Sequence, residues 1–283
     1  MQTPIPFVKM HGLGNDFLLV DCLSSAYDIE QLAAAAPAWC DRHFGVGGDG
    51  VILVLPSPTQ DFRMRIINSD GSEAEMCGNG VRCFAVFAYT HGLTARTQFT
   101  IDTPAGVITP VLHFAEGHVT GVCVDMGEPR LERAEIPMRG PAGPVINEPL
   151  TVDGVTFAVT TVSMGNPHAV IFVDEIAEFP VARYGPLLEQ LPIFPRRTNV
   201  EFVQVMTPTH LKMRVWERGA GITLACGTGA CATLVAGVLT GVAARTATVE
   251  LPGGPLAITW DEANNHLYMT GPAVEVFSGT VLL

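Results

Sequence analysis

The chain repeats itself once, and this duplication constrains its fold more than any other feature of the sequence. Residues 76–83 read MCGNGVRC and residues 225–231 read ACGTGAC, so that Cys77 and Cys226 lie 149 residues apart. In both copies Cys-Gly-x-Gly opens an apolar run, VRCFAVFAY in the first and ACATLVAGVL in the second. A repeat of this length indicates two halves that each fold as one structural unit.

Further landmarks keep nearly the same register. They are Gly14-Asn15 and Gly165-Asn166 at an offset of 151, residues 99–106 and 247–254 at an offset of 148, and Asn68 and Glu217, each nine positions before its cysteine. We therefore expect an α/β (α+β) fold of two pseudo-symmetric halves, each a mostly antiparallel bent sheet wrapped around one helix that is apolar all round. The expected halves are residues 1–125, joined by 272–283, and residues 126–271, with the active site in the cleft between them.

Bulk composition narrows the class of protein. The formal net charge of −12 repels phosphate backbones and anionic lipid, so neither nucleic acid nor a membrane surface is expected as a partner. Residues 219–244 carry no charge, but their six glycines and four threonines favour a buried helix over a membrane span. The N-terminal MQTPIPFVKMHG lacks the features of a secretory signal, so we expect a cytoplasmic protein with reduced thiols.

The seven cysteines then need another explanation than disulfides. None of their spacings is CxxC, so a zinc site is not expected either. Five of them are interpreted as core packing residues: Cys22, Cys40, Cys83, Cys123 and Cys231.

The position of Cys77 and Cys226 at helix starts suggests acid–base chemistry. A thiol at the first turn of a helix meets unpaired backbone N–H groups and the positive end of the helix dipole, which lower its pKa. The adjoining glycines let a ligand approach the backbone, whose N–H groups can hold a carboxylate. If the halves are related by a pseudo-twofold axis, the two thiols face one another across a ligand.

Two opposed thiols suit the inversion of a stereocentre. One removes the α-proton from one face and the other returns a proton to the opposite face, so the two start in opposite protonation states. The helix-start N–H groups can stabilise the carbanion through its carboxylate. No lysine has a Schiff-base context, and GVGGDG at 45–50 precedes a strand where a dinucleotide motif would link a strand to a helix. No cofactor is therefore expected.

The same motifs, in this order, resemble those of diaminopimelate epimerases over nearly the whole chain: KMHGLGNDF (9–17), RHFGVGGDG (42–50), NSDGSEAEMCGNGVRC (68–83), MGNPHAV (164–170), RRTNVEF (196–202) and ERGAGITLACGTGA (217–230). That family interconverts LL- and meso-diaminopimelate on the route to lysine and peptidoglycan. The resemblance implies an isomerase that is independent of pyridoxal phosphate and metal and that is often a homodimer.

The resemblance also implies a set of site residues. Cys77 and Cys226 would be the paired acid–base thiols, and His168 and Glu217 would tune them or help to hold the reacting ammonium group. Arg218 would grip the distal carboxylate. The remaining substrate ligands would be Asn15, Asn68, Gly78, Asn79, Asn166, Asn199, Gly227 and Thr228, together with Glu217. Gly50 stands where some members carry a polar side chain, so no side-chain contact is expected there.

Three other functions fit parts of the sequence. A proline or hydroxyproline racemase would share the two thiols, but such enzymes typically carry a histidine where this chain has Asn79, and they lack the ERGAG stretch. An isomerase of the phenazine-biosynthesis type would share the fold without both cysteines. A redox sensor that joins Cys77 and Cys226 in a reversible disulfide would leave the asparagines and Arg218 unexplained.

Overall fold

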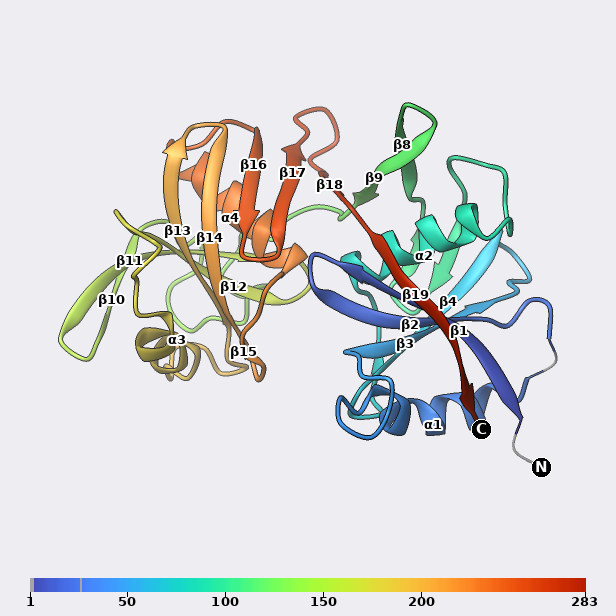
Figure 1. Ribbon diagram of the computed structural model, residues 1–283. Helices are drawn as coiled ribbons and strands as arrows, with labels where there is room; N and C mark the ends of the chain where they lie inside the picture. Colours follow the sequence, from blue (N-terminus) through green and yellow to red (C-terminus); the bar gives the residue numbers. More distant parts are fainter. Residues whose placement is uncertain (1–2, 26) are drawn as a thin grey trace. The chain divides into compact units, whose positions relative to one another are not determined.

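The computed structural model describes residues 3–25 and 27–283, and it divides into two compact units. The first unit contains Met1–Val124 and Gly271–Leu283, and the second contains Asp125–Thr270. The C-terminal strand β19 (Val274–Leu282) pairs antiparallel with β1 (Pro4–Gly12), so the end of the chain completes the sheet of the first unit (Figure 1).

The first unit is a bent sheet with one helix on each face. Its sheet has the order β19-β1-β2-β3-β4-β6-β7, with β5 added beside β4. The strands after β1 are β2 (Asn15–Asp21), β3 (Gly50–Leu55), β4 (Phe62–Asn68), β5 (Glu73–Ala74), β6 (Ile101–Thr103) and β7 (Gly106–Ile108), followed by a hairpin of β8 (Val111–Ala115) and β9 (His118–Asp125). Helix α1 (Ile29–Cys40) lies on one face and α2 (Gly78–Thr90) on the other (Figure 1).

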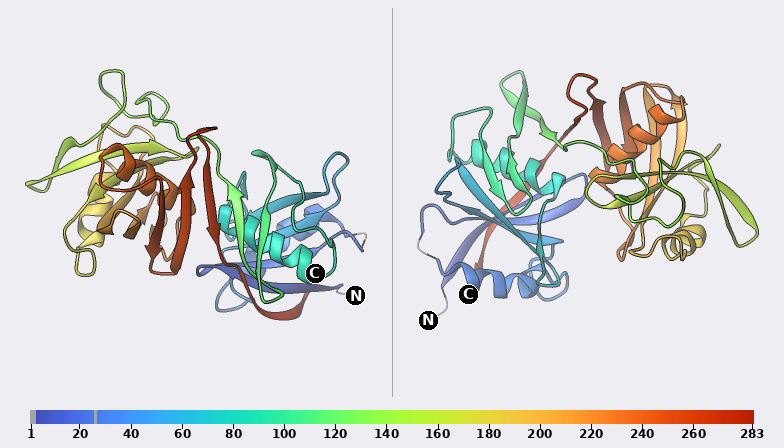
Figure 2. Two further views of the ribbon diagram at one scale, coloured as in Figure 1. Left: turned by 90° about the horizontal axis from the view of Figure 1, so that it is seen from above. Right: turned by 180° about the vertical axis from the view of Figure 1, so that it is seen from behind.

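The second unit repeats this plan. Its sheet runs β10-β11-β12-β13-β14-β16-β17-β18, with β15 beside β14. The strands are β10 (Glu148–Val152), β11 (Val155–Ser163), β12 (Pro167–Phe172), β13 (Asn199–Thr207), β14 (His210–Glu217), β15 (Gly221–Ile222), β16 (Thr246–Leu251), β17 (Gly254–Trp260) and β18 (Leu267–Gly271). Helix α3 (Val181–Glu189) packs on one face and α4 (Gly227–Leu239) on the other, as the view from behind in Figure 2 shows.

The pairing register of the strands shows which residues of the two halves correspond. In the first unit β2 and β3 are parallel with Phe17 opposite Gly50, and in the second β12 and β13 are parallel with His168 opposite Asn199. Most other pairs are antiparallel, and Asn68 ends β4 as Glu217 ends β14. The fold class expected from the repeat is confirmed, because both sheets wrap a central helix in the same topology.

The central helices are buried because a sheet covers them. Every residue of α2 from Gly78 to Ala88 is buried, and so is α4 from Gly229 to Gly237. Such helices have no polar face and therefore depend on the surrounding apolar side chains for stability. In the described part of the chain, no helix combines the length and apolarity needed to cross a bilayer.

Among the cysteines interpreted as core packing, Cys22, Cys40, Cys83 and Cys231 are buried. Cys123, on β9, is only half-buried, because side chains alternate across this strand and its face is less covered.

Candidate active site

Both candidate catalytic cysteines are the N-cap residues of the central helices. Cys77 precedes α2 with extended backbone angles (φ −144°, ψ 110°), and Cys226 precedes α4 in nearly the same conformation (φ −130°, ψ 103°). Each Sγ accepts a hydrogen bond from the backbone N–H three residues on, that of Gly80 or Gly229, at 3.4 Å. Caps are usually serine, threonine, aspartate or asparagine, as Asp28 is for α1, so two cysteine caps indicate a requirement for the thiol itself.

In the first unit, Asn15 and Asn79 surround Cys77. The Sγ of Cys77 lies 3.5 Å from Oδ1 of Asn15, and the same oxygen accepts from Nδ2 of Asn79 at 3.1 Å. Asn79 is itself held by the buried Arg82, whose Nη2 donates to its Oδ1 at 2.8 Å. Gly78 is the first residue of α2, so a ligand at this helix start would meet backbone and amide groups.

Asn15 is fixed from behind by a carboxylate that sequence reasoning did not select. Its Nδ2 donates to Oδ2 of Asp49 at 2.7 Å, and Arg42 joins Asp49 to Asp16. Asp49 belongs to the GVGGDG segment at 45–50, and β3 begins directly after it. The remaining candidate of this unit, Asn68, lies half-buried at the end of β4 and donates to Ser72 Oγ at 2.9 Å.

In the second unit a continuous set of hydrogen bonds leads to Cys226. The Sγ of Cys226 lies 3.6 Å from Oγ1 of Thr228, which accepts from Nδ2 of Asn166 at 3.3 Å. Oδ1 of Asn166 faces Nε2 of His168 at 3.0 Å, and Nδ1 of His168 faces Oε1 of Glu201 at 2.7 Å. Of the four partners only Glu201 was absent from the expected site.

Glu217 is the second acid–base candidate beside Cys226. It accepts a hydrogen bond from the hydroxyl of Thr223, and its charge acts on the Cys226 thiol. Burial raises the pKa of the Glu217 carboxyl above its ordinary value, and the charge of Glu201 adds to this. A raised pKa favours the protonated form of this carboxyl group, which makes it a candidate acid–base group beside Cys226.

The low pKa that the helix start predicts for the Cys226 thiol is wrong. Burial raises the pKa of its thiol well above the ordinary value, and the charges of Glu217 and Glu201 raise it further. The bonds from Thr228 and Gly229 oppose this change without reversing it. Desolvation outweighs the helix dipole because the side chain is only 5% exposed, so Cys226 is a protonated thiol here.

Arg218 and Asn199 form a third part of the second unit's site. Asn199 begins β13 and is buried, donating to the carbonyl of Pro167 at 2.9 Å and accepting from the Arg218 backbone N–H at 2.9 Å. Its amide thus orients the segment after β14. Arg218 is exposed, and its Nη1 donates to the Arg196 carbonyl at 3.0 Å, which leaves other guanidinium N–H groups for a ligand.

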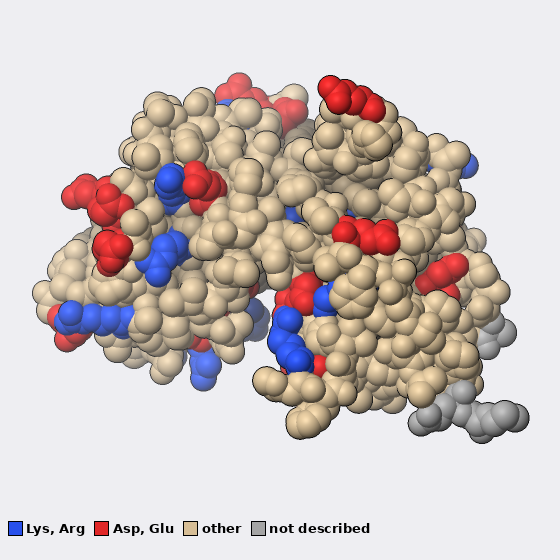
Figure 3. All heavy atoms as spheres, in the orientation of Figure 1, with Lys and Arg blue, Asp and Glu red and all other residues tan. Residues whose placement is uncertain are grey.

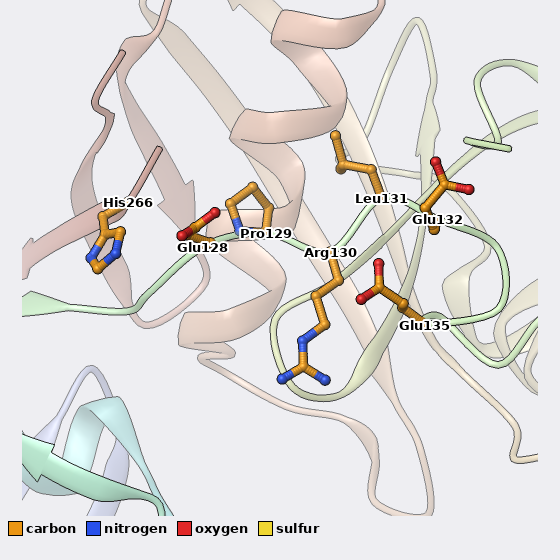
Figure 4. A pocket seen from close by; sticks show the side chains of 7 residues that line it. All are labelled: Glu128, Pro129, Arg130, Leu131, Glu132, Glu135 and His266. Carbon is orange, nitrogen blue, oxygen red and sulfur yellow. The ribbon is translucent and has the colours of Figure 1, made fainter. Parts of the chain in front are cut away.

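A surface pocket of the second unit is lined by none of these residues. It is lined by residues 128–132, Glu135 and His266, whose side chains are drawn in Figure 4. Three lining glutamates give it an acidic character. On the face of the molecule in Figure 3, acidic and basic side chains are interspersed over a mostly uncharged surface.

The duplicated fold is that of solved structures of PhzF-family proteins and proline racemases. A phenazine biosynthesis protein of the PhzF family from Bacillus anthracis superimposes with a TM-score of 0.72 at 18% identity, covering 99% of this chain and 100% of that one. A probable proline racemase from Agrobacterium radiobacter gives a TM-score of 0.69 at 15% identity, covering 98% and 92%. At these identities the likeness establishes the fold alone.

Sequence comparison then gives the family. The family model described as diaminopimelate epimerase matches residues 7–132 and 160–276. The diaminopimelate epimerase of Pelotomaculum thermopropionicum is 58% identical over 273 residues, which are 96% of this chain and 97% of that protein. The chain belongs to the diaminopimelate epimerase family, a family of isomerases, and the resemblance drawn from its motifs is confirmed.

Proposed function

We propose that the chain interconverts LL- and meso-diaminopimelate without a cofactor, as a step in the synthesis of lysine and peptidoglycan precursors. One observation supports the proposal most directly: a cysteine is the N-cap residue of the central helix in both halves of the duplicated fold. Membership of the diaminopimelate epimerase family supports the substrate. The proposed site is the cleft between the two halves, where Cys77 and Cys226 act on opposite faces of one carbon.

The reaction is a transfer of two protons. A thiolate takes the α-proton, and the electron pair of the broken C–H bond delocalises into the adjacent carboxylate. The thiol on the other face then gives its proton to the same carbon, which inverts the centre and leaves the two sulfurs with exchanged protonation states. In this proposal the N–H groups at the two helix starts, Gly78–Asn79 and Gly227–Thr228, bind that carboxylate and stabilise its growing charge.

The starting protonation states follow from the burial of Cys226. Because burial favours the protonated form of the Cys226 thiol, we propose this thiol as the acid of the first turnover in the free enzyme. The role of the base then falls to Cys77. In the reverse direction the roles exchange, and Glu217 and His168 adjust the charge around Cys226 as it loses its proton.

The distal end of the substrate explains the remaining polar residues. Diaminopimelate carries a second carboxylate and a second ammonium group, and Arg218 offers a planar donor pair to the carboxylate. Oxygens of Asn15, Asn68, Asn166, Asn199 and Glu217 accept from ammonium groups. Proline has no second charged end, so this set favours diaminopimelate over proline.

A direct assay separates the two substrates. The purified chain, without added cofactor, is incubated with LL-diaminopimelate and separately with L-proline, and the stereoisomers are separated by chiral chromatography. We expect inversion of diaminopimelate alone. Inversion of proline alone, or of neither compound, would refute the proposed substrate.

A substitution at Gly229 tests how closely the residues around Cys226, the half-site of the second unit, are packed. A Cβ at this position would lie 2.7 Å from Oε1 of Glu201 and 3.1 Å from Sγ of Cys226, so Gly229→Ala must displace both groups. We expect kcat/KM for diaminopimelate to fall at least about tenfold, and the free energy of unfolding to fall by about 1–3 kcal/mol. Gly237→Ala on the same helix is the matched control, because its Cβ meets Ala243 at 2.7 Å away from the thiol. Equal losses of activity in the two variants would contradict the placement.

We further propose that the protein is a cytoplasmic homodimer. Strand β19 is at the edge of its sheet, and Val276 and Phe277 on it are 55% and 46% exposed. Apolar side chains on an open strand edge are typical of a surface covered by another chain. Sedimentation of the purified protein as a monomer at micromolar concentration would exclude the dimer.

A further inference from the structure

A histidine–glutamate pair is buried behind Cys226 and has no counterpart in the first half. His168 on β12 and Glu201 on β13 are both 0% exposed, and Nδ1 of the ring lies 2.7 Å from Oε1 of the carboxylate. Oε2 of Glu201 has no hydrogen-bond partner among the described residues. Two ionisable groups at full burial are costly unless each polar atom is satisfied.

Strand register identifies the equivalent positions in the first half. His168 lies opposite Asn199 as Phe17 lies opposite Gly50, so His168 corresponds to Phe17. Glu201 lies two residues after Asn199 on β13, and Ile52 lies two residues after Gly50 on β3, so Glu201 corresponds to Ile52. The helix glycines confirm the match, because a Cβ at Gly80 would meet Ile52 at 3.2 Å where one at Gly229 would meet Glu201. The histidine–glutamate pair therefore replaces a phenylalanine–isoleucine pair.

This comparison separates a structural role from a functional one. Phe17 and Ile52 are 3% and 0% exposed, and they fill the same place under the central helix without any charge. Replacing a buried ion pair by apolar residues of similar volume is often neutral or stabilising. The duplicated fold therefore does not need a histidine–glutamate pair at these positions in order to form. The presence of His168 and Glu201 in the second half needs a functional reason.

The contacts of the pair point to that reason. The carboxylate of Glu201 offers only lone pairs, so the ring proton of the 2.7 Å bond belongs on Nδ1 of His168. This fixes the ring plane and turns Nε2 to Oδ1 of Asn166 at 3.0 Å. Because that oxygen is also an acceptor, Nε2 donates to it when the ring carries a proton on both nitrogens. Asn166 in turn reaches Thr228 beside the Cys226 thiol.

We propose that Glu201 is a positioning residue of the Cys226 half-site: it holds His168 by its Nδ1 proton and so fixes the amide of Asn166 and the hydroxyl of Thr228 beside the thiol. The inference rests on the proposed function for its kinetic consequence, but the placement of the ring proton does not. In the first half, the Asp49 carboxylate holds Asn15 by accepting a hydrogen bond from its amide. The residues that support the asparagine beside each thiol therefore differ between the two halves.

The test combines kinetics with nuclear magnetic resonance of the histidine side chains. Glu201→Gln keeps an oxygen opposite Nδ1 but removes the charge, and Glu201→Ile installs the residue of the first half. We expect both to lower kcat/KM at least about tenfold, as the loss of a residue that orients a functional histidine commonly does. In Glu201→Ile the Nδ1-bound proton of His168, seen by nitrogen-15 shifts, should be lost because its acceptor is gone.

Two further variants exclude a merely structural role. The double variant His168→Phe with Glu201→Ile transplants the apolar pair, and we expect it to unfold cooperatively with a Tm at or above that of the unchanged protein. Glu148→Gln is the matched control, since it breaks the ion pair of the buried Arg133 elsewhere in the second unit and should keep both kcat/KM and the His168 signal.

Each outcome decides the proposal. An unchanged Nδ1 proton in Glu201→Ile, full activity of Glu201→Gln, or a double variant that fails to fold would overturn it. If the unchanged protein does not invert diaminopimelate, the proposed function fails while the resonance experiment still decides whether Glu201 holds the ring.

Discussion

Cys77→Ser and Cys226→Ser should each lower the rate of diaminopimelate inversion by at least about 10³-fold, because each removes one of the two groups that carry a proton. A serine hydroxyl has nearly the same shape but does not ionise near neutral pH, so binding should suffer much less than turnover. The measurement is kcat and KM in both directions. Cys123→Ser is the control, since Cys123 is half-buried on β9 and lies outside the proposed site.

The two variants should also differ from one another. With one thiol left, the enzyme can remove an α-proton from one face and return a solvent proton to the same face. In deuterated water we therefore expect each variant to exchange the α-proton of one stereoisomer only, LL in one variant and meso in the other, without inversion. Full inversion by either variant, or exchange of the same isomer by both, would contradict the assignment of one thiol to each face.

Glu217→Gln should have the second largest effect, with kcat falling by about 10²-fold or more, because its buried carboxyl group is the acid–base candidate whose charge acts on the Cys226 thiol. The same variant should make the thiol easier to ionise. The charge of Glu217 raises the pKa of Cys226, so a neutral amide lowers it and more thiolate is present at a given pH.

The lower pKa expected for the Cys226 thiol in Glu217→Gln can be measured separately from the loss of kcat. Alkylation of Cys226 by iodoacetamide is followed against pH by mass spectrometry in the unchanged protein, in Glu217→Gln and in the control Glu250→Gln, whose carboxylate pairs with His210 on the surface. The midpoint should move to lower pH in Glu217→Gln alone. A midpoint that stays in place, or moves to higher pH, would show that Glu217 does not act on this thiol through its charge.

Much of the site could be predicted because the chain carries it twice. The offset between Cys77 and Cys226 located both helix starts, and the Gly-Asn pairs located Asn15 and Asn166, which the structure brings into contact with Asn79 and Thr228. Local signals of this kind survive in sequence because helix starts and turns restrict which residues fit.

Other features depend on tertiary burial and could not be predicted. A dipole argument suggested a low pKa for both thiols, but the covering sheet and two carboxylates reverse its direction at Cys226. Glu201 within NVEFVQV looks like the solvent-facing residue of an alternating strand, whereas α4 covers that face and buries it. Aligning the two halves would have given a signal, since the matching residue in β3 is Ile52.

The second half also shows why symmetry in sequence does not imply symmetry in chemistry. Both cysteines cap their helices with the same geometry, yet Asp49 stands behind Asn15 while His168 and Glu201 stand behind Asn166. A substrate with one fixed and one inverting centre presents different groups to the two halves, so a difference between them is consistent with the proposed reaction.

The early time course of deuterium in the reaction with LL-diaminopimelate tests the two-thiol mechanism most directly. In deuterated water the thiol that donates has already exchanged with solvent, so the first meso product should carry one deuterium at the inverted carbon. The remaining LL substrate should carry almost none at that stage. Product that keeps its protium, or LL substrate that gains deuterium as fast as product forms, would indicate a single base and contradict the account.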